Sequence, residues 1–113
     1  MRRWFVVAAG AVVLSSAGLI GQNAQQVAAG QKLFADLGCA KCHSIEGKGA
    51  KIAPLDGVGS KLTAAEIRMW LTDPPAMMAK LPKKPLVPMR KVDRPDADLD
   101  ALVAYLQTLK KKK

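Results

Sequence analysis

The chain's only histidine and its only two cysteines lie within five consecutive residues, Cys39-Ala40-Lys41-Cys42-His43. Three kinds of chemistry use such a pair of thiols. A redox dithiol or disulfide would pair Cys39 with Cys42, but that motif normally accompanies a parallel sheet, and no segment of the sequence shows the sustained alternation of a strand. A zinc site needs further ligands, and the sequence holds no other cysteine or histidine.

Covalent haem attachment uses all three side chains. The pattern Cys-x-x-Cys-His is a haem c attachment signal, in which two thiols bond to the vinyl groups and the histidine becomes an axial ligand. The size of the chain agrees, because 113 residues make one small domain and residues 22–113 contain only three aromatic side chains. So small a core usually needs a disulfide, a metal or a cofactor. We therefore expect one haem c, bound through Cys39 and Cys42, with His43 as a ligand.

The first 21 residues are typical of an export signal. Met1-Arg2-Arg3 precedes an uncharged run of 17 residues from Trp4 to Ile20, and the positive end of such a segment stays in the cytoplasm. The run is just short of a comfortable membrane span. We expect residues 1–21 to be a cleaved signal peptide or a single N-terminal membrane anchor. Residues 22–113 would then be a mono-haem domain outside the cytoplasmic membrane, in the periplasm.

Hydrophobic spacing predicts a first helix that runs to about Leu37 and contains Gly30. A glycine inside a helix costs about 1 kcal/mol relative to alanine, so close crossing by another helix is its most direct explanation. The spacing of Thr63 and Glu66 predicts a capping box at the start of a second helix. That helix ends before Asp73 and directs apolar side chains inward.

The last predicted helix has the clearest periodicity. Apolar residues repeat at helical spacing from Leu99 to Leu109, and Asp96 is the expected N-cap. The lysines that follow are expected to form a frayed tail. The glycine- and proline-rich segments 44–60 and 73–95 are predicted to be loops, and the second is long enough to indicate a functional role.

The chain resembles the class I c-type cytochromes, which are small soluble electron carriers, over about residues 24–109. Besides the cysteine motif, the residues that carry the resemblance are the segments 30–34, 53–55 and 102–106 and the tryptophan at position 70. The resemblance implies an all-α cytochrome c fold, with three to five short helices wrapped around one covalent haem. It also implies that the N- and C-terminal helices cross at Gly30 and Tyr105.

The resemblance also assigns roles to further site residues. The carbonyl of Pro54 would accept a hydrogen bond from His43, and Trp70 would donate its indole N–H to a haem propionate. Met89 would be the sixth iron ligand, because it lies 16 residues before Tyr105, near the usual spacing of the family. Met77 and Met78 remain alternatives for that ligand, whereas Met69 is expected in the core.

The positive charge of the chain bears on which binding partners are expected. Its formal charge is +9, which becomes +7 without Arg2 and Arg3. Many lysines are expected near the haem edge, where they would either form an ordinary solvated surface or steer the protein toward acidic-surfaced redox proteins or membrane oxidoreductase complexes. These are the lysines at positions 41, 48, 51, 80, 83, 84 and 91. Nucleic acid is not an expected partner, since no aromatic residues interleave the lysines.

The expected function is that of an exported one-electron carrier with histidine and methionine as axial ligands, and not that of an enzyme. Two alternatives stay open. The chain would be a fixed haem subunit or module of a larger membrane oxidoreductase if the N-terminal span is retained. It would be a haem sensor or peroxidase if the sixth iron position is open.

Overall fold

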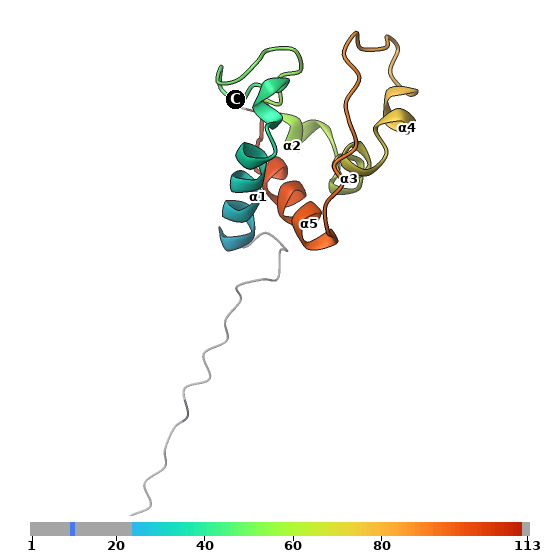
Figure 1. The fold of residues 1–113 in the computed structure, drawn as a ribbon. Helices are drawn as coiled ribbons and strands as arrows, with labels where there is room; N and C mark the ends of the chain where they lie inside the picture. Colours follow the sequence, from blue (N-terminus) through green and yellow to red (C-terminus); the bar gives the residue numbers. More distant parts are fainter. Residues whose placement is uncertain (1–9, 11–23, 112–113) are drawn as a thin grey trace, which may run out of the picture.

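The fold of the chain is all-α, as predicted. The computed structural model describes Gly10 and residues 24–111, so the expected signal peptide or anchor lies, apart from Gly10, outside the described residues. In this described part no β-strand occurs, and the one isolated bridge joins Ile45 to Lys48. The elements are α1 (Ala24–Asp36), the 3-10 helix η1 (Cys39–Lys41), α2 (Val58–Lys61), α3 (Ala64–Thr72), α4 (Pro74–Met78) and α5 (Asp96–Gln107) (Figure 1).

The first and last helices cross at Gly30, as expected. A Cβ atom at this position would collide with the backbone carbonyl group of Ala101 and lie 2.7 Å from the Cβ of Tyr105. One turn further along α1, Phe34 meets Tyr105 edge to face, with ring centroids 5.8 Å apart. The costly glycine therefore has a packing reason, because only hydrogen at this position lets the two backbones approach so closely.

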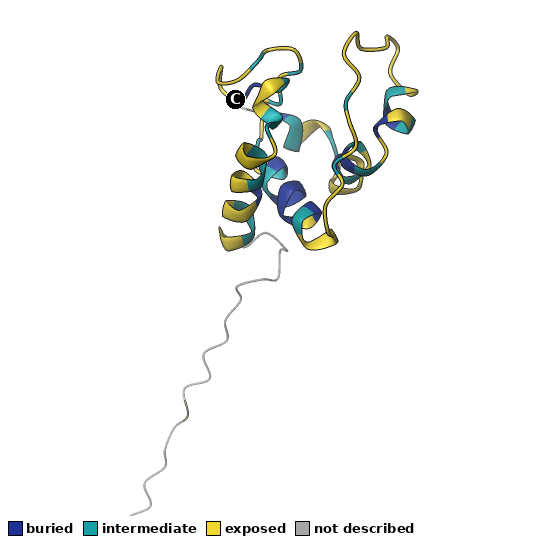
Figure 2. Cartoon of the chain, viewed as in Figure 1, coloured by how far each residue is buried: buried dark blue, intermediate teal, exposed yellow. Residues whose placement is uncertain are grey.

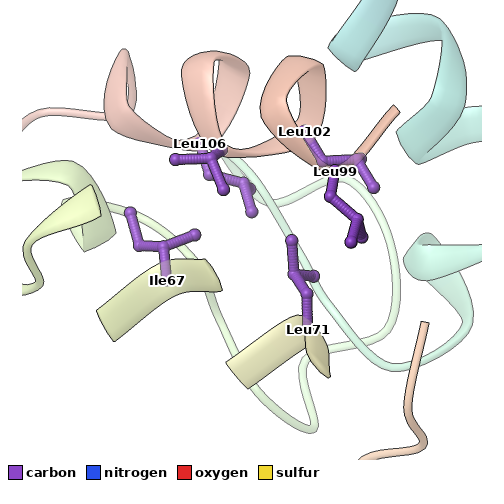
Figure 3. Packing of buried hydrophobic residues seen from close by; sticks show 6 residues of the cluster. Ile67, Leu71, Leu99, Leu102 and Leu106 are labelled. Atoms are coloured by element: carbon purple, nitrogen blue, oxygen red, sulfur yellow. The ribbon is translucent and has the colours of Figure 1, made fainter. Parts of the chain in front are cut away.

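The core lies between α3 and α5. Ile67 and Leu71 of α3 face three leucines of α5, as Figure 3 shows, and the predicted spacing of the last helix is confirmed by burial at positions 99, 102, 103 and 106. Buried residues concentrate on α5, whereas the long connecting segments are mostly exposed (Figure 2). The protein's own core is therefore small, in keeping with a domain that uses a cofactor to complete its interior.

The two ends of α3 lie where the sequence predicted them, but α5 has a different N-cap from the predicted one. Thr63 and Glu66 form the predicted capping box, and α3 ends at Thr72. The N-cap of α5 is Pro95 and not Asp96. The carbonyl of Pro95 accepts the first hydrogen bonds of the helix, while the Asp96 carboxylate lies 2.9 Å from the Arg68 guanidinium of α3. The prediction for Asp96 is thus wrong because its side chain binds across to α3.

Two predicted loops contain short helices. In segment 73–95, α4 begins at Pro74, a position where proline fits because the first turn of a helix needs no N–H donor, and the Asp73 side chain accepts from the N–H of Ala76. In segment 44–60, α2 begins after Gly57, which adopts left-handed backbone angles. The prediction of continuous loop was wrong in both places.

The C-terminal lysines at 110 and 111 form no frayed tail. The N–H of Gly59 donates to the carbonyl of Leu109 at 2.9 Å. The Nζ of Lys110 donates back to the carbonyl of Gly59, and the N–H of Lys111 donates to the Ser60 hydroxyl. The chain end therefore holds α2, which explains how a helix of four residues persists without a favourable sequence of its own. The last two lysines lie outside the described residues.

Candidate functional site

The cysteines and the histidine occupy a single tight turn directly after α1. Gly38 ends the preceding segment with left-handed angles, φ 73° and ψ 27°. The N–H groups of Cys42 and His43 both donate to the carbonyl of Cys39, at 3.2 and 3.0 Å. Cys39 begins η1 and Cys42 is its C-cap, so both thiols lie on the same turn, as attachment to a single porphyrin would require.

The two thiols are free and half-buried. Burial raises the pKa of the Cys39 thiol above its ordinary value, with a smaller contribution in the same direction from the nearby Cys42. No disulfide joins the two cysteines in the structure. The zinc alternative also lacks support, because the described residues contain no cluster of three or more histidine, cysteine, aspartate or glutamate side chains.

His43 is oriented by a hydrogen bond to the loop that follows it. Its Nδ1 donates to the carbonyl of Ala53 at 2.8 Å. The expected acceptor was Pro54, so the prediction of a backbone carbonyl was right and the residue was wrong by one position. Such a bond fixes the ring, raises the basicity of the opposite nitrogen and leaves Nε2 available for a metal.

The acceptor is Ala53 and not Pro54 because backbone hydrogen bonds fix the position of segment 44–55 relative to the motif. The N–H of Ala53 donates to the carbonyl of Cys42, and the N–H of Leu55 donates to the carbonyl of Ser44, each at 2.9 Å. These two bonds fix the register of the loop. Ala53 is thereby held beside the histidine, so its carbonyl and not that of Pro54 comes within reach of the ring.

The same loop turns back sharply through residues with positive φ. Glu46 and Gly47 have φ values of 52° and 80° and join the bridged residues Ile45 and Lys48, as in a two-residue type I′ turn. Gly49 has a φ of 99°, and a Cβ there would press against the carbonyl of His43. The glycine thus permits the loop to lie directly on the backbone of His43.

Trp70 has the property expected of a donor to a bound group. It is half-buried on α3, and its indole N–H has no hydrogen-bond partner among the residues that the structure describes. Since the described residues contain no buried side-chain nitrogen that lacks a hydrogen-bond partner, this N–H is open to solvent and can reach a bound partner. Donation to a haem propionate would supply one, but that role stays a prediction.

The methionines occupy different environments. Met89 is half-buried and packs against the hydrophobic core, and its segment is tied to α3 where the N–H of Val92 donates to the carbonyl of Leu71 at 2.8 Å. Met77 is buried on α4, and Met78 lines a shallow recess of about 270 Å³ beside Pro88. Met69 is 41% exposed, so the prediction that it lies in the core is wrong.

The arrangement fits a haem c. Figure 1 shows the green segment that follows the motif and the orange segment after α4 at the same end of the molecule, on opposite sides of it. The motif offers two free thiols on one turn and an oriented imidazole, and the green segment after it leaves Ile52 59% exposed. Large apolar side chains left in solvent beside a site are typical of a pocket whose apolar occupant covers them.

Comparison with known proteins agrees with this chemistry. The family model described as Cytochrome c matches residues 27–110, a range that contains the motif, Ala53, Trp70 and the methionines of the long segment. No curated protein and no solved structure matches the chain. None of the helices in the described part of the chain is long and apolar enough to span a membrane.

Proposed function

Because the chain belongs to the cytochrome c family of haem-binding electron-transfer proteins, we propose that it is an exported one-electron carrier with a single haem c. Cys39 and Cys42 hold the haem through thioether bonds, and His43 and Met89 are the axial ligands. When bound, haem supplies an iron that gains and loses one electron. The observation that carries the proposal is the oriented imidazole of His43, which follows directly on two free thiols.

The protein side chains set the properties of that iron. The hydrogen bond from His43 to Ala53 keeps the imidazole in one orientation and makes it a stronger electron donor. The thioether of Met89 is a soft, neutral ligand that favours the reduced state and so raises the reduction potential. Met89 is proposed over Met77 and Met78 because its segment is tied to α3 at Val92 and its side chain already packs on the core.

The surface charge supports a carrier that meets acidic partners. All seven lysines that were expected near the haem edge are exposed, and they lie on the segments 41–51 and 80–91 that flank the site. None of them forms a salt bridge within the described residues. Unpaired surface cations raise the rate of encounter with acidic redox proteins or membrane oxidoreductase complexes, in a salt-dependent way. Residues 1–21 place the carrier outside the cytoplasmic membrane, either free in the periplasm or anchored.

Replacing Met89 with alanine tests the ligand set. The ferric wild-type protein should show the weak absorption band near the red end of the visible spectrum that reports sulfur ligation, and Met89→Ala should lose it. The reduction potential should fall in the same variant, because the soft ligand that favours ferrous iron is gone. Met78→Ala is the matched control, and it should keep both the band and the potential.

Other outcomes would assign a different function. If wild type lacks the band and binds carbon monoxide or reacts with peroxide, the sixth position is open and the protein is a sensor or peroxidase. If Met78→Ala loses the band and Met89→Ala keeps it, Met78 is the ligand. Retention of residues 1–21 in the native protein, measured by intact mass, would favour the haem module of a membrane oxidoreductase over a free carrier.

A further inference from the structure

The segment that directly follows α5 is hydrogen-bonded to α2 at three points. The N–H of Gly59 donates to the carbonyl of Leu109, and the Nζ of Lys110 donates to the carbonyl of Gly59, each at 2.9 Å. The N–H of Lys111 donates to the Ser60 hydroxyl at 2.8 Å. Gly59 is therefore bound through both its N–H and its carbonyl by residues about 50 positions further along the chain.

Apolar packing strengthens the contact between α2 and the end of α5. Gly59 lies so close to this end that a Cβ atom would collide with the carbonyl group of Gln107. On either side of the glycine, Val58 and Leu62 pack against the hydrophobic core, and Leu109 packs against the same core. A helix of four residues has little stability of its own, so its position depends on these contacts.

Backbone hydrogen bonds continue from α2 to the acceptor of His43. The N–H of Val58 donates to the carbonyl of Leu55 at 3.0 Å, and the N–H of Leu55 donates to the carbonyl of Ser44 at 2.9 Å. Two residues before Leu55, the carbonyl of Ala53 accepts from Nδ1 of His43 at 2.8 Å. The acceptor thus lies in a segment that is fixed on one side by the motif and on the other side by α2.

We propose that residues 109–111 are a positioning element for the axial histidine, because by holding α2 in place they keep the carbonyl of Ala53 on Nδ1 of His43. The inference rests on the proposed function, since it needs His43 to bind the iron. A contiguous set of hydrogen bonds carries the coupling. The bond to Ala53 makes the imidazole a stronger electron donor, and a stronger donor favours the more positive ferric state. Loss of residues 109–111 should therefore raise the reduction potential.

Shortening the haem-loaded chain separates this effect from that of charge. A chain ended after Thr108 loses the bonds to α2 together with four lysines, whereas a chain ended after Lys111 loses only two lysines. Removal of positive charge by itself favours ferric iron and lowers the potential, or leaves it unchanged where salt screens the charge. The chain ended after Thr108 should instead shift the redox equilibrium about threefold toward ferrous haem, a rise of about 28 mV at about 59 mV per tenfold. The chain ended after Lys111 should show no rise.

Variants at Ser60 test the contact without a change of charge. Ser60→Ala removes the hydroxyl that accepts from the N–H of Lys111. It should raise the potential, but by less than the shorter chain does, because both bonds to Gly59 remain. Ser60→Thr keeps a hydroxyl and is the matched control, so its potential should equal that of wild type. If the chain ended after Thr108 does not fold, the potentials of these two variants decide the question.

Proton exchange shows whether the effect passes through the hydrogen bond of His43. In the reduced protein, NMR follows the Nδ1–H of His43 and the backbone N–H of Leu55. Both should exchange with solvent about tenfold faster in the chain ended after Thr108, because the bonds that protect them open more often. The N–H of Val92, which donates to the carbonyl of Leu71 in α3, is the control and should exchange at the wild-type rate.

Several results would overturn the proposal. Equal potentials for the chains ended after Thr108 and after Lys111 would show that residues 109–111 do not act on the iron. A raised potential with unchanged exchange at His43 would show that the effect reaches the iron by another route. Equally accelerated exchange at Val92 would show only a general loss of stability. NMR signals showing that His43 of the wild-type protein binds no iron would refute the proposed function itself.

Discussion

Replacement of both Cys39 and Cys42 with alanine is expected to abolish covalent haem attachment completely. The two thiols lie on one turn and are the only cysteines of the chain, so no other side chain can form the thioether bonds. Haem that still binds through His43 would dissociate when the protein is denatured. Staining for haem after a denaturing gel measures this directly, with a strong signal for wild type and none for the double variant.

The single variants refine that expectation. Cys39→Ala and Cys42→Ala each leave one thiol, so each should retain some covalently bound haem, with an absorption spectrum shifted by the one unreacted vinyl group. Ala40→Ser is the matched control, because it changes an exposed residue between the two cysteines and leaves both thiols in place. Haem that stays with the denatured double variant would show that attachment uses another residue.

Substitution of Gly30 by alanine is expected to destabilise the fold by about 2 kcal/mol or more. Overpacking costs roughly 1–3 kcal/mol, and occasionally more. The added Cβ meets the backbone of Ala101 and not the end of a flexible side chain, so the two helices must move apart. The higher helix propensity of alanine returns only about 1 kcal/mol. The free energy of unfolding, from urea denaturation of the haem-loaded protein, measures the loss.

A matched substitution on the same helix separates the effect of the close helix crossing on stability from the effect of helix propensity. Gln31 is the next residue of α1 and is exposed, so Gln31→Ala should change the free energy of unfolding by only a few tenths of a kcal/mol. If Gly30→Ala were as stable as Gln31→Ala, the close approach of α1 and α5 would not contribute to the stability of the fold.

The parts of the fold that the sequence predicted well depend on local rules. The capping box at Thr63 needs only residues three apart, and the burial of α5 follows from its periodicity. The crossing at Gly30 was also predictable, because a costly residue inside a helix calls for a packing reason. The short helices α2 and α4 escaped prediction for a different reason. Glycine and proline normally break helices, and α2 is held by hydrogen bonds from Lys110 and Lys111, which lie 51 residues further along the chain.

The features of the candidate site also divide into those that local sequence predicts and those that depend on tertiary structure. Both thiols and the imidazole are predictable because haem attachment uses neighbours in sequence. The acceptor for His43 was misplaced by one residue, since the register of the loop depends on backbone pairing and on positive φ angles at Glu46 and Gly49 that no local pattern specifies. The sixth ligand is the least predictable feature, because three methionines share one long segment and only tertiary structure separates them.

The intact mass of the purified native protein, measured after denaturation, shows whether haem is covalently bound. The expected mass is that of the polypeptide, with or without residues 1–21, plus one haem, because two thiols can attach one porphyrin and the sequence has no second pair. A mass equal to the polypeptide alone, from a protein that bound haem before denaturation, would contradict covalent attachment. It would leave the paired cysteines of the motif without the role assigned to them.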